Sequence, residues 1–211
     1  MANFIKGFMR KRKYGEEIVV VSGLPRSGTS MMMKMLEAAG LPIMTDAVRK
    51  ADEDNPKGYY EYERVKDLEK DPDKSWVRNS RGKVLKVISF LLKELPPDNF
   101  YRVIFLQRDL DEVIASQKKM LDRRGEETRT EDERMKDIYR NHLIQVKILI
   151  PGKPNFELLE VKYKEVLDNP RHQAQRINEF LGGGLDTQAM VSAVDKQLYR
   201  NRKEEIASSS P

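Results

Sequence analysis

A short apolar run followed by a glycine-rich loop and a helix constrains this chain more than any other feature. Ile18–Val21 predicts a buried strand, and Gly23–Ser30 then reads GLPRSGTS. Thr29–Ala39 predicts a helix that ends at Gly40 and Pro42. A glycine-rich turn between strand and helix directs backbone N–H groups toward one point, where the helix dipole adds positive potential. The sequence therefore predicts an α/β unit with an anion site at the start of this helix.

The loop is close to a nucleotide-binding P-loop, G-x-x-x-x-G-K-[ST], but it lacks the lysine, because Thr29 follows the second glycine. A cation stands inside the loop instead, at Arg26, beside the hydroxyl groups of Ser27 and Ser30. Nucleoside triphosphatases also bind Mg²⁺, commonly through an aspartate of a neighbouring strand. The run VIFLQR ends in Arg108, a cation where that acid would stand. We therefore expect an anion other than a triphosphate.

Strand and helix patterns alternate along the rest of the chain. Three further segments predict strands: Lys83–Ser89, Arg102–Arg108 and Phe156–Tyr163. Three others predict helices: Asp109–Leu121, Met135–Ile150 and Asn169–Leu181. Such alternation favours a parallel sheet with helices on both faces. We therefore expect an α/β protein with a three-layer α/β/α architecture and a central, mostly parallel sheet.

The length of 211 residues suits one domain of ordinary size. We place this domain at residues 16–203, after a basic leader at 1–15 and before a tail at 204–211 that we expect to be disordered. The leader holds a KRK run beside an apolar element too short for a signal peptide. It either stays solvated or makes weak contact with a membrane surface. Two polar segments stand between the predicted elements: 45–62 predicts a long connection or short helices, and 121–133 predicts a mobile flap or a solvent-exposed insertion.

Composition narrows the chemistry. The absence of cysteine excludes disulfides, thiolate metal sites and thiol nucleophiles, and it favours a cytoplasmic setting. Lys+Arg 39 against Asp+Glu 34 gives a formal net charge of +5, which favours an anionic ligand but falls short of a dedicated nucleic-acid binder. We expect the two histidines, His142 and His172, to be structural or solvated, so no histidine-rich metal site is predicted.

Three motifs in this order resemble the sulfotransferase family, which uses 3′-phosphoadenosine 5′-phosphosulfate. PRSGTS at Pro25–Ser30 fits the family's P-[KR]-[SA]-G-[TS]-[ST]. QRDLDEVIAS at Gln107–Ser116 fits R-x-P-x-x-x-x-x-S, except that Leu110 replaces the proline. VKYKEVLDNPRHQAQRINEFLG at Val161–Gly182 is similar to the family's Y-E-D-L-x-x-[DN]-P…I-x-x-F-L-G stretch. The three motifs together are far more specific than any one of them.

The resemblance implies a donor and the residues that hold it. The 5′-phosphosulfate would be held by Arg26, Ser27, Gly28, Thr29 and Ser30. The 3′-phosphate would be held by Arg108 and Ser116, and Tyr163 matches a tyrosine near the adenine. Lys86 matches a catalytic strand lysine of the cytosolic members. Arg26 and the loop N–H groups would stabilise the charge on the transferring group, so no metal is required.

The general base is the point at which the chain departs from the cytosolic members. Their histidine, two residues after the strand lysine, is replaced here by Ile88. Among the acids between the first helix and the second strand, we select Glu61 in DNPKGYYEYE, and we expect aromatic walls around it to raise its pKa. Asp46, Asp52, Glu53 and Asp54 are also available, and Asp46 and Glu53 are the next candidates.

Two other function classes stay open at this stage. One is a P-loop kinase of small molecules, which the missing loop lysine disfavours, and the other is a non-catalytic nucleotide-binding or scaffold protein. The acceptor of a sulfotransferase would be a hydroxyl or amine on a small molecule, glycan or peptide, and the sequence does not choose among them. It does not give an oligomeric state either.

Overall fold

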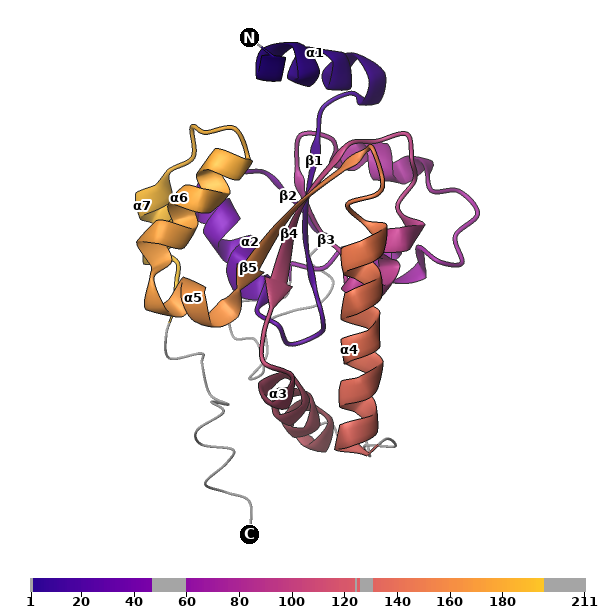
Figure 1. Cartoon of the computed structure of the whole chain (residues 1–211), viewed down its shortest axis with the longest axis vertical. Helices are drawn as coiled ribbons and strands as arrows, with labels where there is room; N and C mark the ends of the chain where they lie inside the picture. The colour runs from indigo at the N-terminus through magenta and orange to yellow at the C-terminus, as the bar shows by residue number, and fades with distance from the viewer. Residues whose placement is uncertain (1, 47–59, 124, 126–130, 196–211) are drawn as a thin grey trace.

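The computed structural model describes residues 2–46, 60–123, 125 and 131–195. In this part of the chain five parallel strands form one sheet in the order β2-β3-β1-β4-β5 (Figure 1). The strands are β1 Ile18–Gly23, β2 Ile43–Met44, β3 Val84–Lys86, β4 Tyr101–Gln107 and β5 Phe156–Lys162. All six residues of β1 are buried, as expected for a central parallel strand covered on both faces.

Helices cover both faces of this sheet (Figure 1). The α-helices are α1 Ala2–Tyr14, α2 Thr29–Ala38, α3 Leu110–Arg123, α4 Asp132–Leu149, α5 Tyr163–Asp168, α6 Pro170–Phe180 and α7 Thr187–Ser192. Three 3₁₀ segments complete the described elements: η1 Glu63–Asp67, η2 Ser75–Ser80 and η3 Ser89–Glu94. Among the described residues, no helix has the length and apolar content needed to cross a membrane.

Two apolar cores lie on the two faces of the sheet. On one face, Met32 of α2, Ile177 of α6 and Met190 of α7 are fully buried in one cluster. On the other face, residues of η2 and η3 pack with Val146 of α4 around Phe105 of β4. The predicted three-layer α/β/α architecture with a parallel sheet is therefore confirmed.

The carboxyl ends of parallel strands meet at one edge of a sheet, where ligands of open α/β folds bind. At this edge β1 ends at Gly23, β3 at Lys86, β4 at Gln107 and β5 at Lys162. The chain crosses from one side of β1 to the other between β3 and β4, so β1 lies beside a reversal of strand order. The glycine-rich loop that follows β1 thus starts from the position where this fold class places its ligands.

Three sequence expectations about elements are corrected by the structure. The predicted strand at 83–89 is only three residues long in β3, because the chain turns after the Val87 N–H donates to the Val21 carbonyl, and η3 begins at Ser89. The ends of the predicted flap at 121–133 are helical, because α3 continues to Arg123 and α4 begins at Asp132, and residues 124 and 126–130 lie outside the described residues.

The third correction concerns α4. Apolar residues recur at helical spacing from Met135 to Ile150, which predicts that this helix packs on the core. Tyr139 and Val146 are buried, but Ile138 is 45% and Leu149 is 51% exposed. The apolar residues of α4 therefore extend beyond the face of the helix that packs against the core.

The basic leader forms α1, whose carboxyl-terminal end contacts the domain. Tyr14 is 7% exposed, and its ring centroid lies 6.1 Å from that of Phe100. Arg10 donates to Glu157, and its guanidinium carbon lies 4.5 Å from the Phe100 ring centroid. In Figure 1 this helix lies at the end of the molecule opposite α3. The leader thus contacts the domain at the end of the sheet remote from the loop. The tail at 204–211 lies outside the described residues.

Candidate anion-binding and catalytic site

The backbone of the loop between β1 and α2 has an unusual conformation. Arg26 has a φ of 68°, in the left-handed region that non-glycine residues seldom adopt, and Gly28, the N-cap of α2, has a φ of 99°. The first turn of α2 contains no acidic side chain. The amino-terminal N–H groups and the positive end of the helix dipole therefore remain without a carboxylate from the helix itself, as an anion site requires.

Tyr163 contacts this loop from the end of β5. A Cβ atom added to Gly28 would lie 2.3 Å from Cδ2 of Tyr163, so only glycine fits beneath the ring. Burial raises the pKa of the Tyr163 phenol, and the nearby Arg108 partly opposes the rise. The phenol is therefore neutral at physiological pH, and it offers an aromatic face and a hydroxyl near the loop.

The loop arginine contacts the second motif directly. Arg26 Nε donates to Ser116 Oγ on α3 at 3.0 Å, and Ser116 is 4% exposed. The two sequence motifs, which the sequence assigned to separate phosphates, are therefore parts of one cluster of side chains.

Arg108 joins the same cluster through several groups. Its Nη1 donates to the backbone carbonyl of Arg26 at 3.1 Å, and its guanidinium carbon lies 4.8 Å from the Tyr163 ring centroid. Its Nε donates to Oε2 of Glu112 at 2.9 Å, and the side chains of this pair are 8% and 6% exposed. Glu112 was not predicted from the sequence. The spacing of four residues between Arg108 and an acid was the available signal.

Ser27 is buried within the loop. It is 1% exposed, and its N–H donates to the Leu24 carbonyl at 3.2 Å. Its Oγ is buried with no hydrogen-bond partner among the described residues. Buried hydroxyls are normally satisfied, so an orphaned one in a phosphate-type loop fits a site that takes an oxyanion ligand.

Glu61 approaches the loop through Lys86 at the end of β3. Lys86 Nζ lies 3.2 Å from Ser30 Oγ and 3.8 Å from Glu61 Oε1, and its side chain is 10% exposed. The other carboxylate oxygen of Glu61 lies 3.4 Å from Lys66 Nζ. Two of the three residues predicted to be catalytic, Glu61 and Lys86, therefore lie together beside the loop.

The surroundings of Glu61 differ from the sequence expectation of aromatic walls. Tyr60 directs its hydroxyl to Glu37 at 2.6 Å, and Tyr62 packs against Trp76 at 5.4 Å between ring centroids. The ion pairs of Glu61 are instead with the two ammonium groups of Lys66 and Lys86.

The backbone around Glu61 is held in place. Its carbonyl accepts a hydrogen bond from Thr45 Oγ1 at 2.8 Å, and Tyr60 before it has a left-handed φ of 52°. The alternative base Asp46 accepts the Glu63 N–H at 2.6 Å. The second alternative, Glu53, lies outside the described residues.

The position of the missing histidine is solvent-accessible, because Ile88 is 41% exposed. A histidine from another element lies close by. His142 of α4 contacts Ser89 Oγ through Nε2 at 2.9 Å and stacks on Phe90 at 3.8 Å between ring centroids. Burial, assisted by Lys93, lowers the pKa of His142. These contacts give this side chain a packing role between α4 and η3.

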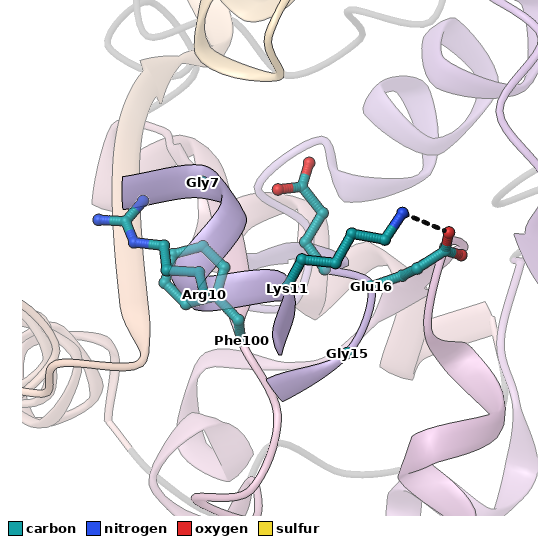
Figure 2. A pocket seen from close by; sticks show the side chains of 8 residues that line it. Gly7, Arg10, Lys11, Gly15, Glu16 and Phe100 are labelled. Atoms are coloured by element: carbon teal, nitrogen blue, oxygen red, sulfur yellow. Dashed lines mark hydrogen bonds and ion pairs between the residues drawn. The ribbon is translucent and has the colours of Figure 1, made fainter. Parts of the chain in front are cut away.

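Among the described residues, no group of three or more histidine, cysteine or acidic side chains is arranged to hold a metal ion. A cavity of about 330 Å³ lies elsewhere, between α1 and the residues that precede β1 and β3 (Figure 2). Arg10, Phe100 and Glu17 line it, as do Lys11 and Glu16, which pair at 3.2 Å. Since these residues lie at the amino ends of the strands, the cavity is separate from the loop site.

A family model described as the sulfotransferase domain matches residues 16–210. The sulfotransferase domain of the Synechococcus PCC 7002 olefin synthase has a similar structure, with 15% identity and a TM-score of 0.52 over 91% of this chain and 82% of that chain. A sulfotransferase from Alicyclobacillus acidocaldarius is 17% identical, with a TM-score of 0.50 over 92% and 90% of the two chains.

A mouse sulfotransferase complexed with PAP is 12% identical to this chain, with a TM-score of 0.50 over 93% of this chain and 67% of that chain. At these identities the solved structures establish a likeness of fold. A search of curated protein sequences finds no match.

Proposed function

Because the chain belongs to the sulfotransferase domain family, its reaction is sulfuryl transfer, and we propose that 3′-phosphoadenosine 5′-phosphosulfate is the donor and a hydroxyl or amine the acceptor. The family match confirms the resemblance that the three motifs indicated, and it removes the kinase and the non-catalytic protein as alternatives. We propose that the transfer is an in-line displacement at the sulfur.

The donor proposal rests on one observation, that two cationic side chains lie together at the loop. Arg26 Nε contacts Ser116, and Arg108 contacts the Arg26 carbonyl, so two guanidinium groups lie together at the start of α2. A ligand with two separate phosphates needs two such receptors, whereas a triphosphate needs the absent loop lysine and a magnesium site. The residues present therefore fit this donor.

We assign roles to the predicted residues on this basis. The proposed contacts of the 5′-phosphosulfate are Arg26, Ser27, Gly28, Thr29 and Ser30, those of the 3′-phosphate are Arg108 and Ser116, and that of the adenine is Tyr163. When bound, the donor supplies the activated sulfuryl group. The orphaned hydroxyl of Ser27 is a hydrogen-bond donor that an oxyanion would satisfy. Arg26 and Lys86 stabilise developing negative charge without a metal.

Glu61 is the proposed general base, which takes the proton from the acceptor hydroxyl or amine. Its side chain is 20% exposed and lies beside Lys86, the residue that contacts the loop hydroxyl of Ser30. Its two carboxylate oxygens pair with Lys66 and Lys86, which hold the side chain beside the loop, where a general base must lie.

The proposal also covers the cellular location of the protein, its acceptor class and a membrane contact. A cytoplasmic location rests on a chain of 211 residues without cysteine. A small molecule, a glycan or a peptide is the proposed acceptor class, and nucleic acid is not a proposed partner. Weak contact of α1 with a membrane surface rests on the exposed basic side chains of Lys11, Arg12 and Lys13.

Transfer of label tests the proposed function. The protein is incubated with donor labelled in its sulfuryl group and with a metabolite extract, in the presence of a chelator. We expect label in an acceptor product, and we expect Glu61→Gln to lose about two orders of magnitude in turnover with donor affinity unchanged, because a general base typically contributes ~10²–10⁴-fold.

Glu63→Gln is the matched control, since Glu63 also pairs with Lys66 but lacks the described contact with Lys86. We expect this variant to retain near-normal turnover. Near-normal turnover of Glu61→Gln would eliminate Glu61 and direct the search to Asp46 and Glu53. Failure of the parent protein to transfer label to any component of the extract, or to bind the donor, would contradict the proposed function.

A further inference from the structure

Glu112 is a buried carboxylate to which the proposed function gives no role. It is 5% exposed and accepts the hydrogen bond from Arg108 Nε at 2.9 Å. Burying two charged side chains costs desolvation free energy, which their mutual attraction only partly offsets. A buried ion pair such as Arg108–Glu112 is therefore weak evidence for a role in stability. The position of this pair at the ligand edge of the sheet indicates a different use.

Arg108 contacts the loop backbone as well as Glu112. Its Nη1 donates to the carbonyl of Arg26 at 3.1 Å, and Arg26 is the loop residue with the left-handed φ of 68°. A non-glycine residue keeps such a conformation only where its surroundings impose it. The hydrogen bond from Arg108 is one constraint of this kind.

Tyr163 connects Arg108 to the loop a second time. The guanidinium carbon of Arg108 lies 4.8 Å from the Tyr163 ring centroid, and the same ring packs on Gly28, where an added Cβ would be 2.3 Å away. Arg108 thus contacts the loop directly at Arg26 and indirectly at Gly28, through the Tyr163 ring. A displacement of Arg108 removes support from both sides of the loop.

We propose that Glu112 is a positioning residue that holds Arg108 against the loop and thereby sets the loop conformation that binds the 5′-phosphate group of the nucleotide. The inference rests on the proposed function and deepens it: Arg108 has a second role besides receiving the 3′-phosphate, and the two anion sites are coupled through it. The Glu112 carboxylate fixes Nε, which orients Nη1 toward the Arg26 carbonyl.

A nucleotide without a 3′-phosphate separates the two roles of Arg108. Adenosine 5′-monophosphate places a phosphate in the loop and nothing at the 3′-site. If Arg108 served only the 3′-phosphate, variants of Arg108 or Glu112 would leave the affinity for this ligand unchanged. If the pair sets the loop conformation, the same variants weaken its binding.

Calorimetry with adenosine 5′-monophosphate and adenosine 3′,5′-bisphosphate tests the proposal on the full chain. We expect Glu112→Gln to weaken binding of the monophosphate by about tenfold or more, the usual effect of losing a charge-assisted contact. The matched control is Asp122→Asn, which removes the same charge from an exposed position of α3 and should leave both affinities within about twofold. A purely structural Glu112 would change the melting temperature without changing the affinity of the folded protein.

Arg108→Lys provides a second variant that keeps a cation opposite Glu112. A single ammonium nitrogen cannot replace the fork that contacts Glu112 and the Arg26 carbonyl together, so we expect the same loss of monophosphate affinity. Unchanged monophosphate affinity in the folded variants would overturn the inference, even if binding of the bisphosphate fell. Failure of the parent protein to bind either nucleotide would instead overturn the proposed function, and this inference with it.

Discussion

Arg26 combines a strained backbone with a cationic side chain at the point where the loop turns. A left-handed φ of 68° in a non-glycine residue costs of order 1–3 kcal/mol. Its side chain is held by Ser116, and its carbonyl is held by Arg108. The loop conformation is therefore determined by residues of the second motif, and substitutions there are expected to act on ligand binding at the loop.

Arg108→Ala is expected to cost about 1.5–3 kcal/mol of affinity for adenosine 3′,5′-bisphosphate, because it removes a charge-assisted contact. Selectivity for the 3′-phosphorylated nucleotide over its 3′-hydroxyl analogue should fall as well. Calorimetry with both ligands measures the two effects. A variant that keeps the full selectivity of the parent would show that the 3′-phosphate is bound elsewhere.

Gly28→Ala is expected to lower the free energy of unfolding by about 1–3 kcal/mol, because Gly28 has a φ of 99° and a new Cβ would lie 2.3 Å from Tyr163. Gly40→Ala is the matched control. Gly40 has a φ of 90°, but nothing lies within 4 Å of its added Cβ, so it reports the backbone strain alone. Urea denaturation of both variants gives the difference, and equal losses would contradict the described contact with Tyr163.

The residues of the loop and of the second motif were predicted from the sequence because short motifs carry them. The Lys86–Glu61 and Lys66–Glu61 contacts were not, because no local pattern specifies which charged side chains of an irregular segment meet a strand end. Glu112 was missed for a related reason. It stands in the first turn of a helix, where an acid is ordinarily expected to face solvent.

At the scale of elements, α1 is attached to the domain through its last turn. Tyr14→Ala is expected to lower the free energy of unfolding by about 2–4 kcal/mol, because Tyr14 is 7% exposed and packs against Phe100. Met9→Ala, at a position of the same helix that is 65% exposed, should change it by less than about 0.5 kcal/mol. Similar, small effects of the two substitutions in urea denaturation would contradict the described docking of α1.

The contact of α4 with η3 is expected to make stability depend on pH. Burial lowers the pKa of His142 below its usual value of 6.5, so the unfolded chain binds a proton at this residue before the folded chain does. The stabilisation is present above about pH 6.5 and is lost as the pH falls through the folded pKa.

The measurement for His142 is the free energy of unfolding between about pH 8 and pH 5. His142→Gln should reduce the decrease that accompanies acidification, whereas His172→Gln, at an exposed position of α6, should not. An identical pH dependence in the parent protein and in His142→Gln would show that protonation of this histidine is not coupled to folding.

Strands β1 and β4 were predicted nearly to the residue, because continuous runs of buried β-branched and aliphatic residues mark central parallel strands. The end of β3 was not predicted, since Val87 continues the apolar pattern and its N–H still donates to the Val21 carbonyl, yet the chain turns into η3 at Ser89. The helical ends of the charged segment at 121–133 were not predicted. A run of charged residues indicates solvent exposure, but an exposed helix end tolerates charge as well as a flap does.

At the scale of the whole molecule, one parallel sheet brings the ends of four strands to a common edge. The loop, Arg108 and Tyr163 follow β1, β4 and β5, and Lys86 is the last residue of β3, so residues far apart in the sequence share one site. The alternation of strands and helices was sufficient to predict this architecture. It was not sufficient to predict the docking of α1, which depends on Arg10 and Tyr14 meeting Phe100.

The central claim is that the loop and the second motif together bind a nucleotide with separate 5′ and 3′ anions and without a metal. The most direct test compares adenosine 3′,5′-bisphosphate with ATP by calorimetry, with Mg²⁺ and with a chelator in its place. We expect the bisphosphate to bind at least about tenfold more tightly than ATP, and we expect the chelator not to change its affinity. Tighter binding of ATP that requires Mg²⁺ would show that the loop binds a triphosphate instead.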